Sequence, residues 1–215
     1  MGGEHESGDG EPRWPAVSAS PEPRLPPLPR ERWDDEDVVA ALRSGFGGVP
    51  PGPMPNVLAT MLHHPRLAGP FLAYNSVLLR RPTIDARLRE LMILRVAWRT
   101  GSNYEWLQHV RLGQRYGVTA DEVAAIAAGA SAGDWTPLEA DLLAATDQLL
   151  DSYRIDDATW DRLAQHLDER QLVEIVFVVG TYTCLAMAFR SFGLQLDADL
   201  DDVVAPAMPP PLDSP

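Results

Sequence analysis

Cysteine is almost absent from this chain, since its 215 residues include a single one, Cys184. One cysteine excludes an internal disulfide, a CxxC redox pair and a zinc site built from thiolates. Basic residues are also scarce, because 18 Lys and Arg stand against 31 Asp and Glu, which gives a formal net charge of −13. A surface of this charge repels phosphate. We therefore expect neither a nucleic-acid partner nor binding to anionic lipid.

Several recognisable signals are missing as well. We find no apolar run that approaches the roughly 20 residues of a membrane span. The first residues have neither a basic stretch nor an apolar stretch of the kind found in secretory signals. GxGxxG, GxxxxGK[ST] and GxSxG are all absent, so no dinucleotide site, P-loop or serine elbow is predicted. These absences favour a cytoplasmic protein that uses no cofactor.

Proline marks the expected edges of the folded domain. Seven of the 20 prolines precede Trp33, five follow Val204, and only Pro137 lies between Ile84 and Ala205. Since proline interrupts helices, the ends are predicted to be irregular and the centre helical. We predict an arm at residues 1–33, a helical domain at 34–200 and a proline-rich tail at 201–215. Disorder is favoured for the arm, although Trp14 and Trp33 would suit a segment draped over a neighbouring subunit.

The central region has the pattern of an all-α domain. Thr83 is a candidate helix cap, Gly117 and Gly193 are candidate helix ends, and Thr119 and Thr136 begin capping-box patterns. No stretch of useful length alternates in polarity as a strand does. We predict about eight helices, with segments that include residues 56–64, 67–79, 84–99, 102–116, 157–167 and 168–192.

Glu90 stands near the start of the most apolar helix, residues 84–99, where its helical neighbours include Ile93, Leu94 and Ala97. Burial on such a face raises the pKa of a carboxyl unless a cation or several donors compensate. A structural ion pair with Arg87, three residues earlier, is an alternative reading of the same pattern.

The next helix places Ser102, Glu105 and His109 on one side. Residues four apart are neighbours on a helix, so Glu105 is expected to touch His109, fix its tautomer and form a proton-transfer pair. An ordinary solvent-exposed contact between the two is the alternative. Tyr104 and Trp106 favour a helix that is enclosed on several sides.

Metal and thiol chemistry have weaker support. Glu105 and His109 lack the second histidine of HExxH and the spacing of di-iron helices. His63 and His64 would join a metal site only if the fold brought them near, and we predict no metal ligands. Cys184 lies in a long apolar helix, where a buried and inert thiol is expected.

A set of motif residues resembles the carboxymuconolactone decarboxylase family, which also contains the alkylhydroperoxidase D proteins. The resemblance is specific over residues 84–123 and looser over residues 38–197. It is carried by Arg89-Glu90-Leu91, Ile93-Leu94-Arg95-Val96-Ala97-Trp98, Gly101, Tyr104-Glu105-Trp106, His109, Gly117 and Glu122.

This resemblance implies an alkylhydroperoxidase D-like helical bundle that assembles as a homo-oligomer such as a trimer or hexamer. The apolar last helix also favours self-association. In the family, the active site lies between the helix with the glutamate and the helix with the histidine, which Glu90 and His109 match. The peroxidatic branch has two cysteines where this chain has Ser102 and Glu105. That departure favours the decarboxylase-type branch, because peroxide reduction needs a thiolate and a resolving thiol.

The combined prediction is a lyase-like enzyme without a cofactor, acting on a small lactone or carboxylated substrate by decarboxylation or isomerisation. The predicted catalytic residues are Glu90, Glu105 and His109, with Ser102 in substrate binding. His109 would move the proton, oriented by Glu105, and Glu90 would stay protonated through a raised pKa. An antioxidant oxidoreductase and a non-catalytic binding or assembly protein are the alternatives.

Overall fold

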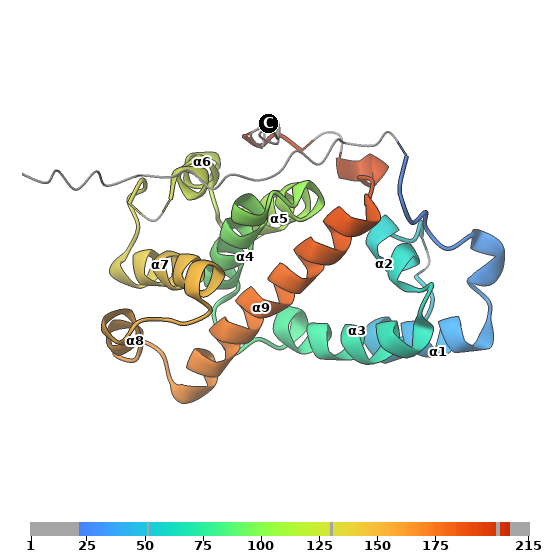
Figure 1. Cartoon of the computed structure of the whole chain (residues 1–215), viewed down its shortest axis with the longest axis horizontal. Coiled ribbons are helices and arrows are strands. Elements are labelled where there is room, and N and C mark those ends of the chain that lie inside the picture. Colours follow the sequence, from blue (N-terminus) through green and yellow to red (C-terminus); the bar gives the residue numbers. More distant parts are fainter. Residues whose placement is uncertain (1–21, 51, 130, 201–202, 207–215) are drawn as a thin grey trace, which may run out of the picture.

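A computed structural model describes residues 22–50, 52–129, 131–200 and 203–206, and within them the chain is all-helical (Figure 1). This confirms the predicted fold class, with nine α-helices in the described residues where about eight were expected. The α-helices are α1 (Glu36–Phe46), α2 (Asn56–Met61), α3 (Pro65–Arg80), α4 (Ala86–Thr100), α5 (Asn103–Arg115), α6 (Ala120–Ala128), α7 (Pro137–Ser152), α8 (Asp157–Leu163) and α9 (Glu169–Phe192). Two 3₁₀ turns, η1 (Arg30–Arg32) and η2 (Ala198–Leu200), lie outside them.

Helix α4 is the centre of the bundle. It packs against α5, α6, α7 and α9, and every residue from Arg89 to Ala97 is buried. This is the buried helix that its apolar sequence predicted. Asp85, rather than the expected Thr83, caps it by accepting the backbone N–H of Arg87. Thr83 instead donates its hydroxyl to Glu174 of α9.

Arg87 links α4 to the starts of two other helices. Thr119 and Glu122 form the capping box of α6, and Thr136 and Glu139 form that of α7, as predicted. The Arg87 guanidinium lies 2.5 Å from Glu122 and 3.0 Å from Glu139. Both glutamates therefore cap a helix and pair with α4 at once, which leaves Arg87 committed to them and not to Glu90.

Residues 22–33 of the predicted arm pack on the chain's own bundle. Leu28 is buried among side chains of α1, α2 and α3, and its N–H donates to the carbonyl of Ala59. Trp33 donates its indole N–H to the carbonyl of Leu28 at 2.9 Å. The rest of the arm, including Trp14, lies outside the described residues.

The chain end also lies on the bundle as far as it is described. The carbonyl of Pro206 accepts the indole N–H of Trp106 at 3.0 Å, and Val203 packs at the edge of the core. The remainder of the proline-rich tail, residues 207–215, lies outside the described residues.

Helix α9 runs the length of the molecule and is exposed along one side (Figure 1). Val178, Tyr182 and Phe189 face the core, whereas Phe177 and Met187 face outward. By length and composition this helix would cross a membrane, which corrects the expectation that no apolar run approaches that size. Half of its apolar window is buried in the fold, as in a core helix.

Candidate active site

The site is built around a carboxylate that is completely buried. Glu90 has no exposed surface, and its Oε1 accepts hydrogen bonds from Arg89 Nη2 at 2.7 Å and Nε at 3.1 Å. Its other oxygen, Oε2, lies 2.6 Å from Nδ1 of His109 on α5. The structure thus joins a guanidinium, a carboxylate and an imidazole in one chain.

These two partners set the charge of Glu90. Burial raises the pKa of a carboxyl, but the nearby His109 and Arg89 outweigh it and hold the pKa of Glu90 below its usual value. The prediction that Glu90 is protonated is therefore wrong. The missing cation is Arg89, its neighbour in sequence, and Arg87 points elsewhere.

His109 is oriented by Glu90 across two helices and not by Glu105 along its own helix. The carboxylate accepts the Nδ1 proton, and this assignment of the tautomer leaves Nε2 free to take a proton. Tyr182 of α9 meets the imidazole edge to face, with ring centroids 4.9 Å apart and planes at 89°. The histidine is 5% exposed, so both the carboxylate and the tyrosine fix it in place.

Glu105 has the properties that were expected of Glu90. It is 2% exposed, and burial raises its pKa to about 8, so it is protonated at neutral pH. Ser102, one turn earlier, is 1% exposed. Neither the two carboxyl oxygens of Glu105 nor the hydroxyl of Ser102 has a hydrogen-bond partner among the described residues. Buried polar atoms of this kind are costly unless a ligand or water satisfies them.

Two residues of the arrangement escaped sequence reasoning. Arg89 stood next to Glu90 in the quoted motif and was passed over because adjacent residues on a helix do not face each other, yet its long side chain folds back to the carboxylate. Tyr182 is about seventy residues away on α9, and only the tertiary fold brings it to His109.

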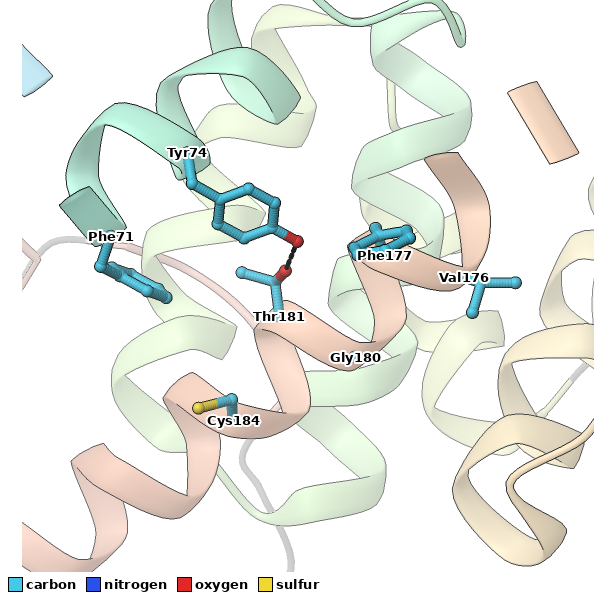
Figure 2. Close-up of a pocket in the computed structure, with 7 residues that line it drawn as sticks. All are labelled: Phe71, Tyr74, Val176, Phe177, Gly180, Thr181 and Cys184. Carbon is cyan, nitrogen blue, oxygen red and sulfur yellow. Dashed lines mark hydrogen bonds between the residues drawn. The ribbon is translucent and has the colours of Figure 1, made fainter. Parts of the chain in front are cut away.

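A cavity of about 440 Å³ opens on another part of the molecule, between α3 and α9 (Figure 2). Its lining is Phe71, Tyr74, Val176, Phe177, Gly180, Thr181 and Cys184. None of the predicted site residues line it. Cys184 is exposed there, so the prediction of a buried thiol is wrong.

The described residues contain no group of three His, Cys, Asp or Glu side chains that would hold a metal ion. His63 and His64 serve the local fold instead. His63 Nε2 lies 2.8 Å from the carbonyl of Pro26, and the His64 side chain accepts the N–H of Leu67 at the start of α3.

Comparison with solved structures places this bundle among alkylhydroperoxidase-like folds. A peroxidase-related protein with an AhpD core from Ralstonia eutropha JMP134 superposes with a TM-score of 0.69 at 16% identity, over 84% of this chain and 95% of that one. A peroxidase-related protein from Silicibacter sp. TM1040 gives 0.65 at 17% identity, over 91% and 98%. The debrominase Bmp8 in complex with 2,3,4-tribromopyrrole gives 0.65 at 20% identity, over 82% and 92%. No curated protein matches the sequence significantly.

A family model matches the part of the sequence that carries the site. It covers residues 65–148, from the start of α3 into α7, and so includes Glu90, Ser102, Glu105 and His109. That model describes the carboxymuconolactone decarboxylase family, the one that the motif residues had suggested. Through residues 65–148, this all-helical chain belongs to the carboxymuconolactone decarboxylase family, with an AhpD-like fold.

Proposed function

We propose that the chain is an acid/base enzyme that needs no cofactor and acts on a small lactone or carboxylated substrate. The observation that carries this proposal is the opposite state of two buried glutamates. Glu90 is held as an anion by Arg89 and His109, whereas Glu105 is neutral and has no partner. Carboxyls whose surroundings push their pKa values apart are a common basis for dividing base and acid roles.

The base role belongs to His109. The anionic Glu90 accepts its Nδ1 proton and stabilises the imidazolium that forms when Nε2 takes up another proton. Arg89 balances the charge of Glu90 within the bundle. This follows the general pattern in which a carboxylate orients a histidine and the histidine moves the proton.

The acid role belongs to Glu105. In decarboxylation, the carbon–carbon bond to the carboxylate breaks, CO₂ leaves, and the electron pair moves into a conjugated carbonyl as an enolate. The Glu105 carboxyl donates a hydrogen bond to that oxygen, and the imidazolium of His109 returns a proton to carbon. Ser102 offers a second hydroxyl to the substrate. Positioned proton transfer of this kind typically contributes about 10²–10⁴-fold to the rate.

The same groups suit an isomerisation, in which His109 removes a proton from one carbon and returns it to another. Decarboxylation is favoured by the family match, whose name specifies a carboxylated lactone. Either reaction passes through an enolate in contact with Glu105, so the two share one test of the residues.

Peroxide reduction is the second candidate, favoured by the peroxidase-related proteins among the similar folds. Such a reaction requires a thiolate and a second thiol to resolve the oxidised sulfur. Ser102 and Glu105 occupy the positions where the resemblance expects those thiols. The single thiol, Cys184, is on α9 at the α3–α9 cavity.

A panel assay separates these candidates. The purified protein is incubated in D₂O with small carboxylated lactones and enolisable carboxylic acids, while NMR follows deuterium incorporation and loss of CO₂. We expect turnover that falls by at least about 10²-fold in His109→Ala and in Glu105→Gln. In parallel, peroxide consumption is measured with a dithiol donor. Dithiol-dependent peroxide consumption, or unchanged turnover in both variants, contradicts the proposal.

A non-catalytic binding role makes a different prediction in the same panel. A compound would then stabilise the wild-type protein against heat without being converted, and neither deuterium nor CO₂ would be detected.

A further inference from the structure

The sides of α3 and α9 that face away from the bundle form one apolar surface, here named the α3–α9 face. Its exposed side chains cover α9 at both ends and in the middle, and continue along α3. They are Leu67, Tyr74, Val77, Val173, Phe177 and Met187, which are between 37% and 63% exposed. Large contiguous apolar patches of this kind are uncommon on monomers and mark interaction sites.

Charge is absent from the central part of this face. From Ile175 to Phe189, α9 contains no Asp, Glu, Lys or Arg. The whole chain has a formal net charge of −13, so two copies repel each other over most of their surface. The α3–α9 face is where two copies meet without placing carboxylates against each other.

Gly180 lies in the middle of α9 and at the cavity of this face (Figure 2). A Cβ atom built on it would meet nothing within 4 Å. The bundle itself therefore gives no reason for a glycine, which weakens a helix interior relative to alanine. Glycine on an open helix face does allow a second backbone to approach closely.

We propose that the α3–α9 face binds a second copy of this chain, with the two α9 helices crossing at Gly180 about a twofold axis. In such an arrangement, each copy contributes the hollow beside Gly180 and also the projecting side chains of Phe177 and Met187. The exposed apolar side chains amount to roughly 700 Å² per copy, close to the ~800 Å² per partner of a standard interface. The two surfaces are identical, as twofold pairing requires.

The mass in solution tests this directly. We expect light scattering at micromolar concentration to give an even multiple of 23.6 kDa for the full chain. Phe177→Glu and Met187→Glu each place two carboxylates in the proposed interface, and should weaken association about a hundredfold or more. Trp160→Glu is the matched control, because Trp160 is 40% exposed on α8, away from this face. Circular dichroism confirms that each variant keeps its helices.

Several outcomes overturn the proposal. These are a monomeric wild type, an assembly with an odd number of copies, and association that is unchanged in both face variants. A fourth is a monomer that sediments with phosphatidylcholine vesicles and loses this binding in Phe177→Glu. In that case the α3–α9 face binds lipid.

Cys184 provides a second readout. It lies one turn from Gly180, and any disulfide must join two copies because the sequence has no other cysteine. Mild oxidation with copper phenanthroline should give a linked dimer faster in the wild type than in Phe177→Glu, and none in Cys184→Ser. Equal rates in the first two overturn a crossing at Gly180. All these variants leave Glu90, Glu105 and His109 intact, so failure here does not bear on the acid/base proposal.

Discussion

Replacing Glu105 by glutamine should remove a large pH dependence from the stability of the protein. The carboxyl is 2% exposed, and its pKa is about 8 in the fold against an ordinary value of 4.5. Between these values the folded state keeps a proton that the unfolded state releases. Raising the pH therefore destabilises the fold, by about 1.4 kcal/mol for each pH unit.

The magnitude follows from the two pKa values of Glu105. Full titration from below pH 4.5 to above pH 8 costs about 5 kcal/mol of unfolding free energy, of which about 3 kcal/mol is lost by pH 7. Glu105→Gln keeps the shape and cannot ionise, so this loss should be absent. Urea denaturation at several values from pH 5 to pH 9 measures the difference between the two proteins. Parallel pH profiles of the wild type and Glu105→Gln would refute a protonated Glu105.

Three further substitutions test the packing and pairing of the bundle by chemical denaturation. Glu90→Gln leaves Arg89 buried without its counter-ion and should cost about 3–5 kcal/mol, while changing both residues to Met should cost less than the two single losses combined; additive losses would contradict the pairing. Thr136→Ala removes the acceptor of the α7 capping box and should cost about 1 kcal/mol, and an unchanged unfolding midpoint would show that the cap contributes nothing. Gly45→Ala places a Cβ 2.4 Å from that of Leu72, so we expect a loss of about 1–3 kcal/mol as α1 and α3 are forced apart; wild-type stability would show that this contact yields easily.

Local sequence was sufficient for most of the fold. The starts of α6 and α7 follow from capping boxes at Thr119 and Thr136, and α9 ends at Gly193, which adopts a left-handed conformation. These signals act within one turn of chain and need no knowledge of the rest of the bundle. The continuous apolar run of α4 likewise predicted burial on all sides.

The roles of the two glutamates were not accessible in the same way. Glu105 and His109 are neighbours on α5, and helical spacing favours their contact, yet the imidazole turns toward Glu90 on α4. The pKa of each carboxyl depends on which side chains reach it from other helices. Arg89 and His109 reach Glu90, and no donor among the described residues reaches Glu105.

The exposure of Cys184 was missed for a related reason. Apolar residues surround α9 on nearly every side, so its sequence has no polar stripe to indicate which side faces outward. Only packing against α4 and α7 shows that Tyr182 faces inward and Cys184 outward.

The position of Arg87 has a consequence for local unfolding. Because one guanidinium holds both capping glutamates, Glu122 and Glu139, fraying of α6 or α7 at its first turn breaks a contact with α4 as well. The beginnings of these three helices should therefore open as one cooperative unit, visible as matched rates of amide hydrogen exchange. A single surface-proximal side chain would then set the lifetime of the region that encloses the far side of α4.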